Sequence, residues 1–168
     1  MKEFIFLFHT RQLSREAKTF KNPFTGEPAT VLLPEPFSDS EQADVEAYLK
    51  QHKYEGPEPE GEGYLRQLSG KESIRIRGMD MASGVSTGNL AVEVIASEMS
   101  QPLLKHFYEL MESAKLAVMS TTGDNVLVPA ESLDELTRQH WPDAVCIKTE
   151  EEFLASIGRV WSEREVSS

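Results

Sequence analysis

The heptapeptide EFIFLFH at residues 3–9 is apolar on both of its alternating faces. A strand with one solvated face alternates apolar and polar side chains, whereas a strand covered on both faces has a nearly continuous apolar run. The heptapeptide therefore predicts a central strand of a sheet, covered on both sides. The rest of the chain must supply the neighbouring strands and the helices that pack against them.

Several other segments predict the remaining strands of this sheet. The clearest is SIRIR at residues 73–77, which puts isoleucine on one face and arginine on the other. Together with residues 64–68 and the short Ser-Gly-Lys turn between them, it predicts a β-hairpin. Residues 10–28 are polar and end in a segment rich in proline and glycine, so we expect a loop there. Further strands are expected at residues 29–33, 90–96, 116–119, 126–128 and 144–147.

Helices are predicted where a capping residue precedes apolar side chains at helical spacing. Capping-box pairs occur at Ser38 and Glu41, at Ser132 and Glu135, and at Thr149 and Glu152, while Ser100 is the capping residue of the remaining helix. The helices are expected at residues 39–52, 99–114, 133–141 and 150–164. These elements predict an α+β fold: an antiparallel or mixed sheet of five to eight strands flanked by about four helices, in a single compact domain spanning residues 1–168.

One segment interrupts this alternation of strands and helices. Residues 55–63, EGPEPEGEG, combine glutamate with proline and glycine, which disfavour regular structure. We expect an extended, solvated loop there. The residues before it supply too few strands to form a core of their own, so the loop is expected to lie within the single domain rather than between two domains.

The charge of the chain narrows the range of partners. The 168 residues include 17 Lys and Arg against 28 Asp and Glu, giving a net charge of −11. This charge opposes binding to nucleic acid or to an anionic membrane. No run approaches the roughly 20 apolar residues of a spanning helix, and the N-terminal apolar stretch is too short for a signal peptide. A cytoplasmic protein is therefore expected.

The glycine-rich stretch RGMDMASGVSTGNLAVEV at residues 77–94 is the one segment that resembles a phosphate loop. A P-loop needs two glycines five positions apart, followed by Lys and then Ser or Thr, whereas Val85 and Ser86 follow Gly84 here. A strand pattern, rather than a helix, follows Gly88, so no helix N-terminus is available to hold an anion. The stretch predicts a hairpin connection.

No local motif predicts catalysis or metal binding. The histidines His9, His52, His106 and His140 are scattered without a metal-binding spacing, and we expect each at the surface or at the edge of a helix. The single Cys146 cannot form an internal disulfide and is expected in the core. The sequence therefore predicts no catalytic residue, no cofactor-binding residue and no metal ligand.

The best candidates for contact with a ligand or partner are charged residues near the predicted hairpin. Arg75 and Arg77 lie two residues apart on one strand, so their side chains share a face and could hold an anion or an acidic partner. Arg66 on the preceding strand could join them. The alternative is a solvated row of arginines paired with glutamates such as Glu93. The candidate contact residues are Arg75, Arg77, Arg66, Glu58, Glu60 and Glu62.

Two functions are compatible with these observations. The first is a non-catalytic module that binds a basic protein, because strong negative charge is combined with an acidic loop and no catalytic motif. In composition the chain is similar to small acidic proteins that neutralise bacterial toxins. Such a module could neutralise its partner or serve as a scaffold for it. The alternative is a small-molecule-binding protein or enzyme whose site is assembled from distant residues. A homodimer formed through an exposed apolar face is compatible with both functions.

Overall fold

The computed structural model describes residues 1–11, 13–80, 85–123, 125–132 and 134–166, and it confirms the expected α+β class. In the described residues the α-helices are α1 (Asp39–Gln51), α2 (Gln101–Ala114), α3 (Glu135–His140) and α4 (Glu150–Ser156). The strands are β1 (Lys2–His9), β2 (Leu13–Lys21), β3 (Pro28–Pro34), β4 (Glu55–Glu58), β5 (Gly63–Gln67), β6 (Ser73–Asp80), β7 (Val85–Ala96), β8 (Ala117–Met119), β9 (Val126–Pro129), β10 (Val145–Ile147) and β11 (Ser162–Glu165). Short 3-10 helices occupy Pro59–Gly61 (η1), Ala130–Ser132 (η2) and Ile157–Arg159 (η3).

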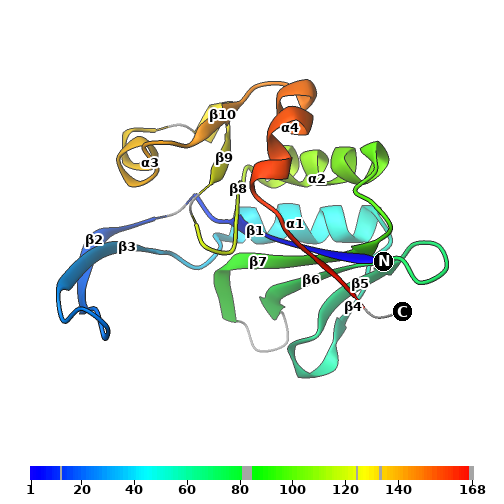
Figure 1. The fold of residues 1–168 in the computed structure, drawn as a ribbon, viewed down its shortest axis with the longest axis horizontal. Coiled ribbons are helices and arrows are strands. Elements are labelled where there is room, and N and C mark those ends of the chain that lie inside the picture. Colours follow the sequence, from blue (N-terminus) through cyan, green and yellow to red (C-terminus); the bar gives the residue numbers. More distant parts are fainter. Residues whose placement is uncertain (12, 81–84, 124, 133, 167–168) are drawn as a thin grey trace.

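Most of the strands form one mixed sheet with β1 near its centre (Figure 1). The strand order is β10-β9-β8-β1-β7-β6-β5-β4, and β11 pairs with β1 beside this path. All the pairings are antiparallel except that of β9 with β10. β7 runs along one edge of β1, while β11 and β8 share the other edge, at its first and last residues respectively. The expected central strand is confirmed.

The two faces of the sheet differ in how far they are covered. Phe4, Phe6 and Phe8 of β1 are buried on the face where α1, α2 and α4 lie. On the opposite face Glu3 and His9 are buried while Ile5 and Leu7 are half-buried, so the expectation of a strand covered on both sides holds only in part for that face. We call this opposite side of the sheet the outer face. In register across β1, β7 and β6 it carries Ile5, Leu7, Arg75, Arg77 and Glu93.

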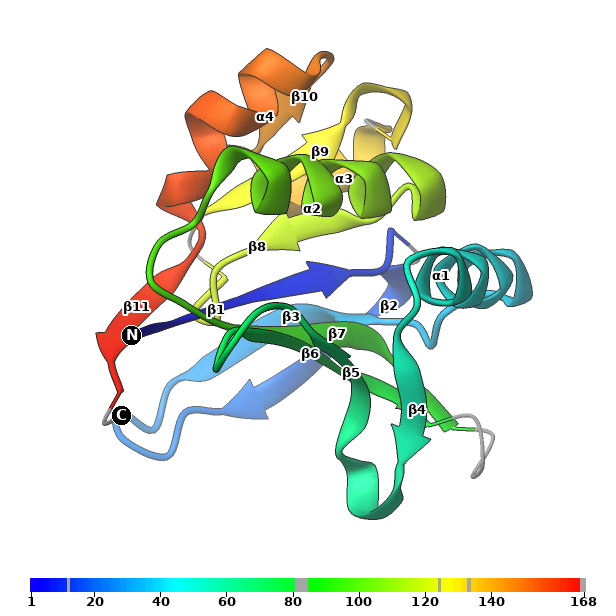
Figure 2. The same ribbon diagram turned by 90° about the vertical axis from the view of Figure 1, so that its right-hand side faces the viewer.

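Helix α2 packs between α1 and α4 above the sheet (Figure 2). Its apolar side chains Phe107, Leu110 and Met111 form a fully buried stripe, and the Phe107 ring meets that of Phe6 edge-on at 5.0 Å. The capping box predicted for α1 is confirmed, since Ser38 accepts from the Glu41 amide and Glu41 accepts from the Ser38 amide. No helix in the described part of the chain is long and apolar enough to span a membrane.

The loop predicted at residues 10–28 is wrong for most of its length. Strand β2 occupies Leu13–Lys21 and pairs with β3 as a separate two-stranded sheet. Figure 1 shows this ribbon projecting from the rest of the molecule. The polar sequence of residues 10–28 lacks the apolar alternation by which half-buried strands are recognised, so β2 was not predicted.

The acidic loop predicted at residues 55–63 is also wrong, because the segment forms β4, η1 and the first residue of β5. β4 pairs with β5 on one side only and ends the order of strands in the main sheet. Proline lacks the amide donor that a central strand needs, but an edge strand tolerates it. The prolines Pro57 and Pro59 are therefore compatible with the observed edge hairpin.

Two predicted helices have different limits in the structure. The last helix ends at Ser156 and continues only as η3, and residues expected in it form β11 against β1. Gly158 weakens the helix, and the vacant edge of β1 offers the following residues backbone partners. In α3 the predicted capping box at Ser132 is replaced by Asp134, whose side chain accepts from the Thr137 amide.

The glycine-rich stretch lies in the hairpin formed by β6 and β7, as predicted. A Cβ atom on Gly78 would stand 2.2 Å from the Asn89 carbonyl oxygen, and one on Gly88 would stand 2.3 Å from that of Glu35. These glycines permit close approach of neighbouring backbone segments. The connection at residues 81–84, which includes Gly84, lies outside the described residues.

Candidate functional site

The structure places Arg75 and Arg77 together on the outer face, with carboxylates beside them. Arg75 Nη1 lies 3.1 Å from Glu62 Oε2 and also donates to the Glu62 carbonyl at 2.9 Å. Arg77 Nη2 lies 3.4 Å from Glu62 Oε2 and 3.3 Å from Glu93 Oε2. These two arginines therefore have the intramolecular glutamate partners that the alternative interpretation expects.

Arg66, which could have joined them, does not lie on the outer face. The register of β5 with β6 sets Arg66 opposite Ile74 and Leu65 opposite Arg75. Because residues directly opposite each other share a face, Arg66 lies on the helix side of the sheet with the fully buried Ile74.

The acidic candidates are also separated. Glu62 lies next to Arg75 and Arg77, as described above. Glu58 ends β4 and is half-buried, and Glu60 is exposed in η1. Among the described residues neither Glu58 nor Glu60 forms an ion pair.

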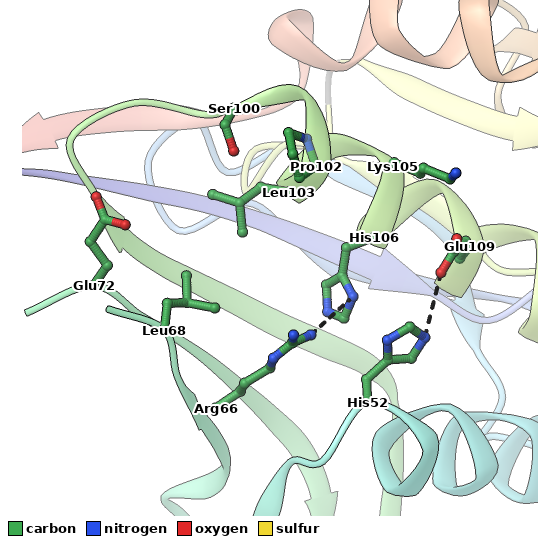
Figure 3. Close-up of a pocket in the computed structure, with 10 residues that line it drawn as sticks. All are labelled: His52, Arg66, Leu68, Glu72, Ser100, Pro102, Leu103, Lys105, His106 and Glu109. Carbon is green, nitrogen blue, oxygen red and sulfur yellow. Dashed lines mark hydrogen bonds and ion pairs between the residues drawn. The ribbon is translucent and has the colours of Figure 1, made fainter. Parts of the chain in front are cut away.

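The side chain of Arg66 lines a pocket of about 510 Å³ between the end of α1, the start of α2 and the β5–β6 turn (Figure 3). Its polar lining consists of His52, Arg66, Glu72, Ser100, Lys105, His106 and Glu109, and its apolar lining of Leu68, Pro102 and Leu103. Arg66 and His52 also line an adjoining cavity of about 310 Å³ with Lys53, Glu55, Leu65 and Gln67.

His106 is the centre of the polar contacts in this pocket. Its Nε2 lies 2.7 Å from Tyr54 Oη, and its Nδ1 lies 3.5 Å from Arg66 Nη1. A guanidinium can only donate, so Nδ1 must present its lone pair to Arg66. The ring proton then lies on Nε2, which donates to the Tyr54 hydroxyl. The arginine thus selects the tautomer of the histidine.

Two more side chains complete what we call the His106 cluster, which consists of Tyr48, His52, Tyr54, Arg66 and His106. Tyr48 donates from its hydroxyl to the His106 carbonyl at 2.7 Å, and its ring centroid lies 4.4 Å from that of His52. The His52 and His106 rings meet edge-on at 4.6 Å. Burial raises the pKa of both tyrosines, so their hydroxyls remain protonated at neutral pH.

The histidines of the cluster are uncharged at neutral pH. Burial, with smaller contributions from His52 and Arg66, lowers the pKa of His106 to about 3. Burial also lowers the pKa of His52, and Arg66 acts in the same direction, whereas Glu109 opposes them. The positive charge in the centre of the cluster is therefore that of Arg66.

Among the residues that the structure describes, the charge of Arg66 has no carboxylate partner. Within the described part of the chain no Asp or Glu oxygen lies within ion-pair distance of its guanidinium. The two glutamates of the pocket are engaged elsewhere: Glu109 lies 3.5 Å from His52 Nε2, and Glu72 accepts from the amide and hydroxyl of Ser97, each at 3.1 Å. An anion from outside the chain could take the place of the missing carboxylate.

Sequence reasoning missed most of this site. His106 was expected at the surface or at the edge of a helix but is buried, and so is His9. Tyr48, Tyr54 and His106 come from α1, from the segment after it and from α2, so no spacing along the chain marks them as a group. Of the five cluster residues, Arg66 alone is a candidate contact residue in the sequence analysis. It is grouped there with Arg75 and Arg77, which lie on the other face of the sheet.

The arrangement lacks a metal centre of the usual kind, since no three His, Cys, Asp or Glu side chains converge within the described ranges. The arrangement places the Arg66 cation next to neutral His106, at the wall of an accessible pocket. No family model matches the chain, and the comparisons with curated proteins and with solved structures gave no match either.

Proposed function

We propose that this protein binds a small anionic molecule in the Arg66 pocket. The observation that carries the proposal is the contrast between arginines. Arg75 and Arg77 have glutamates within 3.1–3.4 Å, whereas Arg66 lines a pocket of about 510 Å³ without a carboxylate partner in the described residues.

Physical chemistry supports an anion as the missing partner. A guanidinium that is partly removed from water loses hydration, and a charged, hydrogen-bonding partner compensates for that loss. Its planar fork of donors matches a carboxylate or a phosphate group. Neutral His106 accepts from the guanidinium without neutralising it, and Tyr54 contacts the other nitrogen of the His106 ring. Exposed Lys105 on the pocket wall adds a second positive charge.

The proposal can be tested by titrating the protein with acetate, benzoate and inorganic phosphate, using calorimetry and amide chemical shifts. Arg66→Gln should weaken binding of any anion that binds by about tenfold or more, because one partner of a desolvated charge pair is removed. Arg77→Gln is the matched control, since it removes an arginine from the outer face. Equal binding by wild type and Arg66→Gln, or binding that depends on Arg77, would contradict the proposal.

The basic-protein partner expected from the sequence is the second candidate. Its support is the net charge of −11 and the position of exposed Glu55 and Glu60 on the edge hairpin of the main sheet. Replacing Glu55, Glu58 and Glu60 together by glutamine should slow association with a basic protein such as lysozyme, and added salt should do the same to the wild type. Association that is unaffected by both changes would remove this candidate.

A further inference from the structure

We infer that the ligand of the Arg66 pocket is a monocarboxylate with an apolar body, such as an arylalkanoate or a short-chain fatty acid. This inference rests on the proposed function and specifies its ligand class. Two features support it. The apolar side chains of the pocket lie together on one side of Arg66, and Arg66 is the single cation of the His106 cluster.

Figure 3 shows the apolar part of the pocket lining beside Arg66. Leu68, just after β5, and Leu103, from α2, point toward each other on one side of Arg66, and Pro102 lies beside Leu103. Leu68 and Leu103 are each half-buried and pack against the main core. An apolar group placed between these leucines would leave water while a head group attached to it lay against the guanidinium.

The charges around the pocket favour a head group with a single negative charge. Arg66 offers one planar fork, which a carboxylate fills with two parallel hydrogen bonds. Glu72 and Glu109 lie on opposite sides of the leucine and arginine groups in Figure 3. A second negative charge on the ligand would be repelled by these carboxylates, and Lys105 on the exposed wall is the one other cation that lines the pocket.

The size of the pocket argues against a small inorganic anion as its natural occupant. About 510 Å³ lies within the range of small-molecule sites. An inorganic anion at Arg66 would leave the space between Leu68 and Leu103 unused. A ring or a short alkyl chain attached to the carboxylate fills that space.

The experiment compares four probes by calorimetry on the wild-type chain. 3-Phenylpropionate has both parts of the inferred ligand, acetate has the carboxylate alone, 3-phenylpropanol has the apolar body alone, and inorganic phosphate is a small multivalent anion. We expect 3-phenylpropionate to bind more tightly than each of the others by about tenfold or more, since both contributions are present in it alone.

Two variants assign the contributions to their side chains. Leu103→Ser should reduce the advantage of 3-phenylpropionate over acetate, and Arg66→Gln should reduce its advantage over 3-phenylpropanol. Leu7→Ser, which changes a half-buried leucine on the outer face, should do neither. Thermal unfolding of each variant shows whether it is folded, and the four-probe comparison on the wild type does not depend on the variants.

The outcomes separate this inference from the proposed function. If acetate, phosphate and 3-phenylpropionate bind equally and all depend on Arg66, the inferred ligand class is wrong while anion binding stands. Preference for phosphate has the same meaning. If no anion binds in a manner that depends on Arg66, both the proposed function and this inference are overturned.

Discussion

Adjacent strands of one hairpin present their arginines to opposite faces of the sheet, and the two groups have different partners. On the outer face, Arg75 and Arg77 share Glu62, and Arg77 also reaches Glu93. On the helix face, Arg66 has no carboxylate within ion-pair distance in the described part of the chain, and its Nη1 lies 3.5 Å from neutral His106. The outer-face arginines are therefore paired with glutamates of the same chain, whereas Arg66 presents its positive charge at the wall of a pocket.

The difference shows that residue type alone does not distinguish a site from a solvated surface. All three arginines lie on two paired strands within 12 positions of one another. What separates them is the alternation of side chains along each strand and the register between the strands. The following predictions test this contrast between the helix face and the outer face, in order of decreasing expected effect.

The largest expected difference is in the free energy of unfolding, between truncations of two neighbouring β1 side chains that point to opposite faces of the sheet. Phe6 is fully buried beneath the helices, and Leu7 is half-buried on the outer face. Phe6→Ala should lower the free energy of unfolding by about 3–5 kcal/mol, because it leaves a cavity in the core. Leu7→Ala should cost about 1 kcal/mol. Chemical denaturation measures both, and equal losses would contradict the assignment of the two faces.

A smaller loss of stability is expected from removing one hydroxyl in the His106 cluster. Tyr54→Phe takes away the oxygen that lies 2.7 Å from His106 Nε2 and leaves a buried ring N–H without its acceptor. We expect a loss of about 1–3 kcal/mol in the free energy of unfolding. Tyr108→Phe is the control, since Tyr108 is half-buried and outside the cluster. Equal effects of the two changes would argue against the assigned tautomer of His106.

The pH dependence of stability should reveal the buried imidazole. The pKa of His106 is about 3 in the folded protein against 6.5 for an ordinary histidine, so the unfolded chain binds a proton that the folded chain does not. The stabilisation is therefore present above pH 6.5 and is lost as the pH falls from 6.5 toward 3.

Between pH 7 and pH 5 this linkage amounts to up to about 2 kcal/mol. His106→Gln should flatten the acid side of the profile of unfolding free energy against pH by that amount. His140→Gln is the comparison, because burial also lowers the pKa of His140 but this half-buried side chain at the end of α3 lies outside the cluster, so we expect a smaller flattening. If wild type and His106→Gln lose stability in parallel, the histidine is not held neutral.

The smallest expected effect is the change in protein stability when Arg77 or Arg66 is replaced by glutamine. Arg77→Gln should cost about 0.2–1 kcal/mol, as is usual for partly exposed ion pairs, and high salt should reduce this cost. Arg66→Gln should cost nothing or stabilise the fold, because it removes a cation for which the described residues supply no carboxylate partner. Thermal melts at low and high salt measure both changes, and a salt-sensitive loss in Arg66→Gln would indicate an unrecognised partner.

Much of the fold could be predicted because its main elements bury one apolar face. The phenylalanines of β1, the capping box at Ser38 and the stripe of α2 are local patterns that the structure confirms. Three strands were missed. β2 lies in the projecting ribbon, β4 is the last strand in the order of the main sheet, and β11 pairs with only the first half of β1. Such strands depend mainly on backbone pairing, which leaves little trace in hydrophobic periodicity.

The candidate site could be predicted only in fragments, because tertiary structure determines it. The sequence singles out Arg66, but a shift of one residue in register moves a side chain to the other face. The pattern of α1 includes Tyr48 and His52 as helix-face residues, with nothing to indicate that His106, more than 50 positions later, packs against both. Only the packing of α1 on α2 brings these side chains together.

The strand β11 has a further consequence for the handling of this protein. It covers Lys2 to Ile5 on the edge of β1 that β8 leaves free. Proteolysis or truncation within residues 162–165 would uncover backbone amides and carbonyls in the middle of the sheet, beside the fully buried Phe6. Exposed backbone next to an apolar core recruits strands from other molecules. Trimmed material should therefore self-associate, even though every residue of the Arg66 pocket is intact.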